Sequence, residues 1–562
     1  MIGSAASASS AEPSRGNTTC ERYKKKYVIP GGFIPGPNKP KIVESFLFPG
    51  LHHVAALNQR GGIPVWDVRR DTKYLSLLHI LFATADGPGM TYLNGLVGHS
   101  GKIGCRLWCG LAGRHKQGAP IYYPVLFKPN DYEVAGCNHG DVDPAHVRPI
   151  DTVRYSENLR TVCASTTQSR YEKNRLETGI CKPSIFSGLE PHIMGVPNMF
   201  PSDIMHLILN LADILINLWR GTLDCGPTDS KASWTWAVLQ GDVWKMHGQD
   251  VANCTPYLPG SFDRPPRNPA EKINSGYKAW EFLLYLFGLG PGLFYKVLPD
   301  AFWESYCRLV YGVRIFYQKS ISAEECKSAH QQLVLFTAEY EKLYVQRRKD
   351  RIHFVRQSIH NLSHMGTETV RVGPGSAYSQ WTMERSIGNL TEEIKQYSKV
   401  YTHLSERGLR RSSVNALLAL VPSLDKSQNL ANHVPLGEKV LGDGYLLLRK
   451  LEKRVTSLDE FEATALRNYV LQHRDELPAD WKAEVIRWAR LRLPNGQIAR
   501  SAWKERPKGT EGIRMGRMVK ASDFATGINN LRKLTLKKNF DSLKTLQGSF
   551  TLPKCCTIFS TE

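Results

Sequence analysis

Residues 83–116 read ATADGPGMTYLNGLVGHSGKIGCRLWCGLAGRHK and contain the densest collection of chemically useful side chains in the chain. Asp86 follows the apolar run Tyr74–Thr84 and stands in a Gly/Pro turn. A carboxylate at the end of a strand is suited to holding a metal ion, whereas an Asp in a turn commonly accepts a hydrogen bond from its own backbone. The local sequence leaves both interpretations of Asp86 open.

Soft metal ligands follow Asp86 in the next part of the chain. Cys105 and Cys109 are spaced C-x3-C, His115 comes soon after, and Cys137 and His139 stand in the segment AGCNHGD. Tetrahedral zinc needs four such ligands. We predict a small Zn²⁺ site formed by the three cysteines, with His139 or His115 as the fourth ligand. The alternative is a set of buried free thiols beside unrelated histidines.

Two later patterns place carboxylates on predicted helices. The apolar spacing over Pro201–Trp219 predicts an amphipathic helix with Ser202 as its N-cap, and Asp203 and His206 would share one face at its start. Glu384 stands in a further predicted helix that follows Gln380. Each pattern has an ordinary alternative. An Asp is favoured at a helix N-terminus by the macrodipole, and a Glu–Arg pair is common on a helix surface.

The charge balance indicates an acidic partner. Lys and Arg number 73 against 52 Asp and Glu, which gives a formal charge of +21. Such an excess favours nucleic acid or an anionic membrane. The longest apolar runs, 207–219 and 282–295, are interrupted by polar residues or by Gly and Pro, so they predict no spanning helix and we expect no membrane partner. We predict that DNA is contacted by basic clusters on helical faces, namely Arg347, Arg348, Lys349, Arg407, Arg410 and Arg411.

The motifs occur in a recognisable order. Asp-Gly-Pro-Gly at 86–89 precedes a Gly-His and two-cysteine element, then Cys-x-His at 137–139, Asp-x-Met-His at 203–206 and Trp-x-x-Glu-Arg at 381–385. This order resembles the CACTA (En/Spm-type) DNA transposases, and the fungal branch is the closer match. Stretches such as GGFIPGPNKPK, YYPVLFKP and SERGLRRSSVNAL are also similar to that branch, and the resemblance runs from about Lys26 to Trp503.

The resemblance implies an α/β fold with an RNase H-like catalytic core, in which three acids hold two Mg²⁺ or Mn²⁺ ions for in-line attack on a phosphodiester. Asp86 resembles the second acid and Glu384 the third, with Asp203 and His206 as the accessory D-x-x-H. Cys105, Cys109 and Cys137 resemble the family's zinc-ligand element, although many members have C-x2-C. The first acid is expected in an Asp-Gly-Phe-Asn-Pro-like segment upstream, and nothing in this sequence matches it.

The same resemblance, combined with the sequence patterns, predicts the organisation of the chain. A mainly helical insertion separates the second acid from the third. The predicted segments are a disordered or extended tail (1–40), a partial RNase H-like core (41–110), a small zinc-binding element (105–145), a core helix (203–219) with the helical insertion (146–370), the end of the transposase core (371–430) and a basic C-terminal region (431–562).

Three hypotheses for the function follow. The first is a cut-and-paste transposase, or a piece of one, that acts on transposon ends and target DNA in the nucleus. A homo-oligomer and a second element-encoded DNA-binding protein would be further partners. The second is a catalytically inactive DNA-binding descendant, because the first acid is missing. The third is a zinc-stabilised RNA-binding or scaffold protein.

Overall fold

The computed structural model describes residues 3–4, 29–34, 40–67, 70–147, 151–258, 264–394, 398–424, 438–442, 445–451, 455–473, 481–493, 498–501 and 559–560. The chain forms two compact units. Unit 1 comprises Met1–Trp244 and Lys278–Pro422, and unit 2 comprises Lys245–Tyr277 and Ser423–Glu562. The fold is mixed α/β and mostly helical. No helix in these ranges is both long and apolar enough to cross a membrane.

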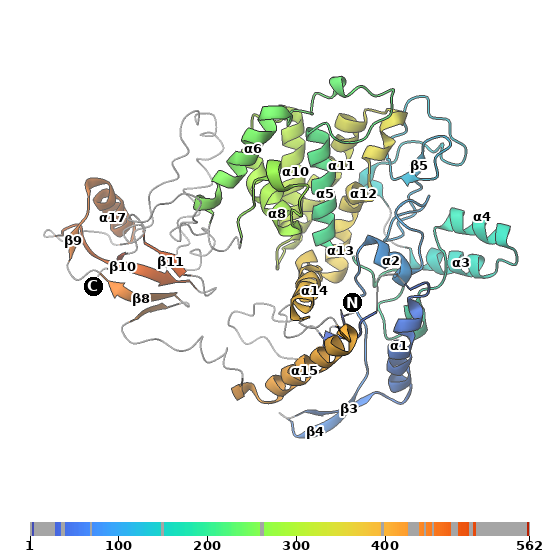
Figure 1. The fold of residues 1–562 in the computed structure, drawn as a ribbon, viewed down its shortest axis with the longest axis horizontal. Helices are drawn as coiled ribbons and strands as arrows, with labels where there is room; N and C mark the ends of the chain where they lie inside the picture. Colours follow the sequence, from blue (N-terminus) through green and yellow to red (C-terminus); the bar gives the residue numbers. More distant parts are fainter. Residues whose placement is uncertain are drawn as a thin grey trace. The chain divides into compact units, whose positions relative to one another are not determined.

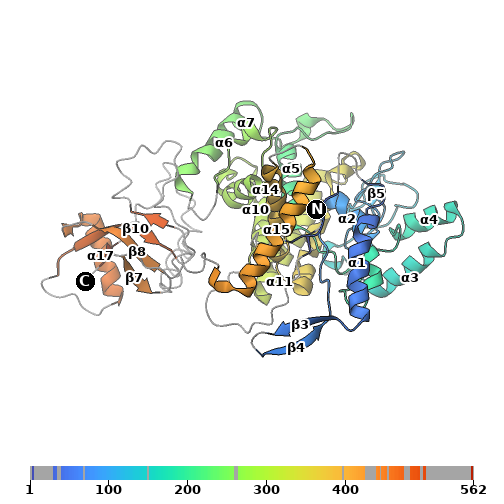
Figure 2. The same cartoon turned by 60° about the horizontal axis from the view of Figure 1, so that its bottom comes forward.

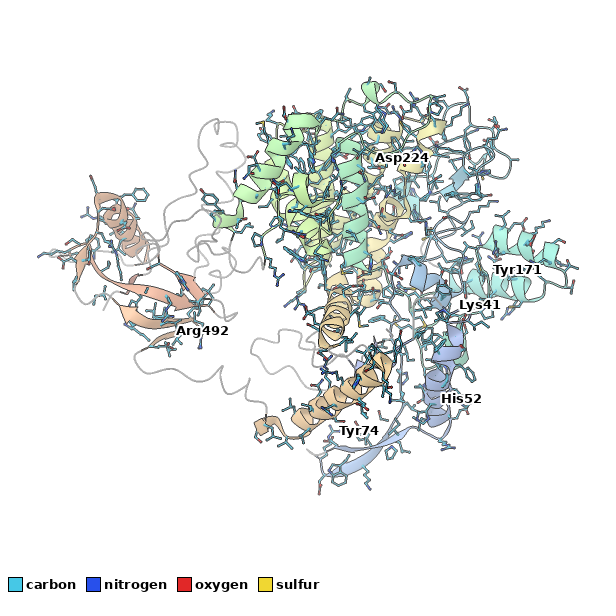
Figure 3. All side chains as sticks on the ribbon, in the orientation of Figure 1. Lys41, His52, Tyr74, Tyr171, Asp224 and Arg492 are labelled. Carbon is cyan, nitrogen blue, oxygen red and sulfur yellow. The ribbon has the colours of Figure 1, made fainter. Side chains whose placement is uncertain are left out.

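The N-terminal part of unit 1 combines a long helix, β-hairpins and a short capped helix (Figure 1). Strands β3 and β4 pair antiparallel, and Figure 3 labels Tyr74 on β4. After this hairpin, Ile80 N–H donates to the carbonyl of His192 and Ala83 N–H to that of Met199. The bounds are β1 (Gly3–Ser4), β2 (Ile29–Pro30), α1 (Glu44–Gln59), β3 (Ile63–Asp67), β4 (Thr72–Ser76), α2 (Gly87–Asn94), β5 (Arg114–His115) and β6 (Tyr122–Tyr123).

Helices α3 (Thr152–Cys163) and α4 (Gln168–Thr178) lie side by side at one edge of unit 1 (Figures 1 and 2). Tyr155 of α3 packs edge-on against the ring of Trp108, with the ring centroids 5.5 Å apart. The indole N–H of Trp108 donates to the carbonyl of Thr178 at 2.7 Å. These two helices therefore hold the loop that contains Cys105 and Cys109.

The centre of unit 1 is a set of helices around α5 (Ile204–Trp219). Helix α5 is apolar on most sides, and Trp219 at its end is fully buried between the rings of Phe294 and Tyr306. Helices α10 and α11 pack closely, because a Cβ at Gly312 would lie 2.5 Å from Leu333. Helix α6 (Gly241–Asn253) begins in unit 1, and its residues from Lys245 on belong to unit 2. The further bounds are α8 (Ala279–Leu284), α9 (Gly290–Leu293), α10 (Asp300–Phe316), α11 (Ala323–Tyr340), α12 (Gln357–Asn361), α13 (Met365–Val372), α14 (Trp381–Glu393) and α15 (Val400–Leu420).

Unit 2 contains an antiparallel sheet in the order β11-β10-β8-β7, and β9 and β12 also pair with β10. Trp488 and Leu491 of β10 contribute to its apolar core, together with Leu447 of β8. Arg492 ends β10 (Figure 3). The bounds are α7 (Pro269–Lys272), β7 (Lys439–Gly442), β8 (Tyr445–Leu451), β9 (Thr456–Ser457), α17 (Glu460–His473), β10 (Glu484–Arg492), β11 (Ile498–Arg500) and β12 (Phe559–Ser560).

Several local expectations are confirmed. The predicted helix over Pro201–Trp219 is present as Ile204–Trp219, and a helix follows Gln380. The predicted N-cap Ser202 is wrong: Asp203 caps α5, because its carboxylate accepts from the backbone N–H groups of Met205 and His206. The RNase H-like core stays a prediction. The 1–40 tail and the 431–562 region fall largely outside the described residues.

Candidate metal centre and carboxylate group

A tight turn brings two thiols together in the loop after α2. Trp108 N–H donates to the carbonyl of Cys105 at 2.9 Å, and Trp108 has a left-handed backbone with φ of +53°. This conformation is uncommon outside glycine, and the buried indole of Trp108 holds it in place. Cys105 and Cys109 therefore face the same point from the two ends of the turn, and both are buried.

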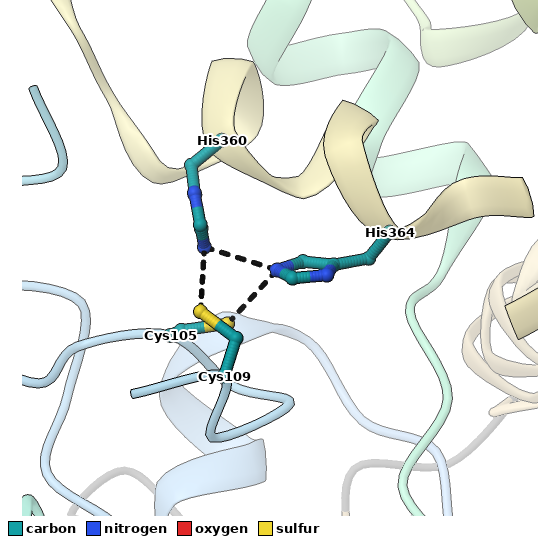
Figure 4. Close-up of side chains that lie close together, drawn as sticks. All are labelled: Cys105, Cys109, His360 and His364. Carbon is teal, nitrogen blue, oxygen red and sulfur yellow. Dashed lines mark hydrogen bonds between the residues drawn. The ribbon is translucent and has the colours of Figure 1, made fainter. Parts of the chain in front are cut away.

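Two histidines from a distant segment meet these thiols. His360 lies in α12, and His364 ends a 3₁₀ turn, Leu362–His364, that directly continues α12. A spacing of four residues on helical backbone places both imidazoles on one face. Figure 4 shows the two rings and the two sulfurs converging. The side chains of this Cys/His group (Cys105, Cys109, His360 and His364) are all buried, and their ligand atoms lie within 4.8 Å of one another.

The distances within the Cys/His group fit a tetrahedral metal. With ordinary zinc bond lengths, a sulfur and a nitrogen ligand lie about 3.5 Å apart and two nitrogens about 3.3 Å apart. Here Cys109 Sγ lies 3.3 Å from His360 Nε2, and Cys105 Sγ lies 3.5 Å from His364 Nε2. The two Nε2 atoms are 3.1 Å apart. The Cys/His group can therefore hold a metal ion such as zinc.

The electrostatics of the Cys/His group favour one thiolate. Burial alone would raise the pKa of Cys105, but the hydrogen bond from Cys109 and the positive charge of His364 and His360 hold it well below the ordinary value. The hydrogen bond to Cys105, followed by burial, raises the pKa of Cys109. Burial opposes a charge on His364, but the thiolate of Cys105 raises the pKa of that histidine. A cation bound among these atoms would replace the proton that they share.

The other predicted zinc ligands lie elsewhere, so the structure corrects three of them. Arg114 is buried beside Cys137 and His139, and its guanidinium donates to the carbonyls of both at 2.9 Å. His115 Nδ1 lies 2.9 Å from the carbonyl of Lys116. Cys137, His139 and His115 thus belong to a loop built around Arg114. Within the described part of the chain, the histidines that lie beside Cys105 and Cys109 are His360 and His364.

Asp86 caps helix α2. Its Oδ1 accepts from Gly89 N–H at 2.7 Å, and a Cβ at position 89 would lie 2.6 Å from that oxygen, so the turn requires glycine. Asp86 is exposed, and the turn lies close to the start of α5 because Ala83 pairs with Met199. The ordinary turn-capping role considered for Asp86 is therefore present, and it leaves the second carboxylate oxygen, Oδ2, free of any hydrogen bond in the described structure.

Asp203 connects the starts of two helices. Its carboxylate caps α5 and also accepts from Gln380 N–H at 2.8 Å, directly before α14. His206 Nδ1 lies 2.5 Å from Asp203 Oδ2. The hydrogen bond to Asp203 raises the pKa of His206, and the negative charges of Asp86 and Glu384 add to this. Burial would raise the pKa of Asp203, but His206 and the backbone donors lower it.

Three carboxylates from three separate stretches of sequence therefore act on one imidazole. We call Asp86, Asp203, His206 and Glu384 the carboxylate group. Glu384 lies in the first turn of α14 and is exposed, as is Asp86, whereas Asp203 is buried. The group combines a buried carboxylate, paired with a half-buried imidazole, and two exposed carboxylates.

Most of the basic residues predicted to bind DNA have partners within the chain. Arg347 forms an ion pair with Asp141, Arg348 with Asp350, and Arg407 and Arg411 with Glu393. Lys349 and Arg410 are exposed, and neither forms an ion pair in the described structure. The remaining free charge in the predicted clusters is thus carried by Lys349 and Arg410.

Sequence reasoning missed His360 and His364, although a signal was present. The segment RIHFVRQSIHNLSH lies in the predicted helical insertion (146–370), and an H-x3-H pair on a helix is a common half of a zinc site. The two halves lie more than 250 residues apart, as the separations of 251 and 259 residues between the paired ligands show. In comparisons with known proteins, no family model matches this chain and no curated protein matches it significantly.

Proposed function

We propose that this chain is a DNA-processing protein of the transposase type, whose carboxylate group binds Mg²⁺ or Mn²⁺ and whose Cys/His group binds a structural Zn²⁺. The observation that carries the proposal is the Asp203–His206 pair at the start of α5, 2.5 Å apart and bonded through Asp203 to the start of α14, with the negative charges of Asp86 and Glu384 acting on the same imidazole. The proposed site of action is nuclear DNA.

The roles proposed within the carboxylate group follow from exposure and hydrogen bonding. Asp86 and Glu384 are exposed and can offer oxygen ligands to a divalent ion. Asp203 is buried and fully engaged, so it orients His206 and the start of α14. Asp86 and Glu384 would hold the divalent ions, which would supply activation of an attacking water or DNA 3′-hydroxyl and stabilisation of the leaving oxygen. His206 can donate a hydrogen bond to a phosphate oxygen nearby.

The Cys/His group has a different role in this proposal. Its ligands are buried and all four positions are taken by protein atoms, so a bound ion has no open position for substrate. Zinc there would join the loop after α2 to the segment α12–α13. Structural zinc sites contribute directly to folding stability. The group therefore supports the architecture that holds the carboxylate group.

The test is Mn²⁺-dependent nicking and strand transfer on duplex DNA by the full chain and by Asp86→Ala and Glu384→Ala. We expect each variant to lose activity at least about 100-fold while it keeps DNA binding. Asp151→Ala, at the N-cap of α3, and Glu392→Gln, on α14, are matched controls and should retain activity. Activity that survives both site variants would refute the assignment.

The same experiment separates the alternatives. A chain that binds duplex DNA but nicks none, at any Mn²⁺ concentration, would be an inactive descendant. A chain that prefers RNA over duplex DNA would support the RNA-binding hypothesis. Fluorescence anisotropy with matched RNA and DNA duplexes measures this preference, and its salt dependence reports how many phosphates are neutralised.

A further inference from the structure

Arg106 lies between the Cys/His group and the carboxylate group. It directly follows Cys105, and its guanidinium donates to the carbonyl of Ala85 at 3.4 Å, one residue before Asp86. The Nε atom of Arg106 is buried and has no hydrogen-bond partner in the described structure. One long side chain thus runs from the proposed zinc loop to the Asp86 turn.

The surroundings of Arg106 are acidic. Burial lowers the pKa of its guanidinium, but the carboxylates of Glu368, Asp203 and Asp86 oppose this effect. An arginine side chain keeps its charge in proteins. Arg106 nevertheless forms no direct ion pair with any carboxylate in the described ranges, unlike Arg351, which pairs with Asp229 at 2.6 Å.

Glu368 supports the same arrangement from the other half of the Cys/His group. It lies one helical turn after His364, is buried, and accepts from Ser202 N–H at 2.8 Å. Arg371 lies 3.6 Å from its carboxylate. Each half of the Cys/His group is thus followed by a charged residue, of which Arg106 bonds to the residue before Asp86 and Glu368 to the residue before Asp203.

We propose that Arg106 is a positioning residue of the carboxylate group, which holds the Asp86 turn against the loop that contains Cys105. This inference rests on the proposed function for its catalytic consequence. Its structural consequence, the fixed position of the Asp86 turn, does not depend on that function. Arg106 itself touches no substrate in this scheme.

The test compares Arg106→Met and Arg106→Lys with the wild-type chain, loaded with zinc, and with Arg308→Met as a matched control. Arg308 is a half-buried arginine paired with Glu339 on α11. Hydrogen exchange of residues 85–94 is the first readout. We expect Arg106→Met to accelerate exchange at Gly89 and Met90 at least about fivefold, because their N–H groups bond to Asp86.

The second readout is nicking activity against Mn²⁺ concentration. We expect Arg106→Met to lower kcat at least about tenfold without raising the Mn²⁺ concentration needed for half-maximal activity, and Arg106→Lys to recover part of kcat. Zinc content should remain one ion per chain. Unchanged exchange over 85–94 would overturn the proposal even if the chain nicks no DNA. A loss of zinc together with global acceleration of exchange would also overturn it, because Arg106 would then serve the fold as a whole.

Discussion

The Cys/His group and the carboxylate group lie in the same unit and differ in almost every physical property. The first has four buried ligands of soft or borderline character, and their contacts are made to one another. The second has one buried acid, one half-buried imidazole and two exposed acids. Four buried ligands suit a structural ion, whereas exposed carboxylates suit the substrate-exchanging role that we propose for the second group.

The largest expected effect on stability comes from disrupting the Cys/His group. His360→Ala should remove zinc from the chain and lower the free energy of unfolding of unit 1 by several kcal/mol, since structural zinc contributes roughly 10–16 kcal/mol in small zinc-binding peptides. Metal analysis of the purified protein and thermal unfolding measure the two effects. His360→Cys should retain zinc, because three cysteines and one histidine also form a common zinc site.

The ligands predicted from sequence provide the control for this experiment. Cys137→Ser and His139→Ala remove residues that lie by Arg114 and not in the Cys/His group. Both variants should bind as much zinc as the wild type. Zinc lost from Cys137→Ser but kept by His360→Ala would reverse the assignment made here.

Substitution of Asp203, the buried acid of the carboxylate group, should produce the next largest loss of stability. Asp203→Ala removes the cap of α5 and leaves the N–H of Gln380 without its acceptor. Loss of a cap costs about 1 kcal/mol and a buried orphan donor about 1–3 kcal/mol, so we expect a destabilisation of about 2–4 kcal/mol. Chemical denaturation measures it, and Asp151→Ala, an exposed cap on α3, should cost only about 1 kcal/mol.

The paired charges of Asp203 and His206 in the carboxylate group should make the stability of the folded chain depend on pH. Because the pKa of His206 is raised in the folded chain, its contribution is complete below the ordinary histidine value of about 6.5 and disappears as the pH rises through the raised value. The lowered pKa of Asp203 adds stability above about 3.9 that is lost as the pH falls through the folded value.

The wild type should therefore exceed His206→Asn in stability most strongly between about pH 4 and 6.5. Denaturation midpoints measured across this range test the expectation. His146→Asn is the control, because His146 lies 2.9 Å from Asp143 at the same i,i+3 spacing but is largely exposed. If the stability difference between the wild type and His206→Asn does not change with pH, the charges of His206 and Asp203 do not stabilise each other.

The sequence predicted local features better than long-range ones. The helix over 204–219 followed from its apolar spacing, and the Cys105/Cys109 pair from its residue types. Ser202 and Asp203 are both good caps, so the sequence alone could not choose between them. Cys137 and His139 were wrongly predicted as zinc ligands because hydrogen bonds from Arg114 to their carbonyls determine where they lie. Such backbone hydrogen bonds cannot be inferred from the spacing of residues in the sequence. The histidine pair required knowledge of which distant segments pack together.

The smallest effects on stability should come from Asp86 and Glu384, the exposed acids of the carboxylate group. These two residues distinguish most clearly between a role in function and a role in folding. Asp86→Ala removes an exposed cap and should cost about 1 kcal/mol, while Glu384→Gln should change stability by no more than about 0.5 kcal/mol. If the same two substitutions abolish Mn²⁺-dependent nicking, Asp86 and Glu384 serve the reaction and not the stability of the fold. A Glu384→Gln variant that unfolds several degrees earlier would instead place Glu384 with the structural residues, because an exposed side chain without a structural contact has no means of stabilising the fold to that extent. Calorimetry of Glu384→Gln beside Glu392→Gln, on the same helix, makes this distinction directly.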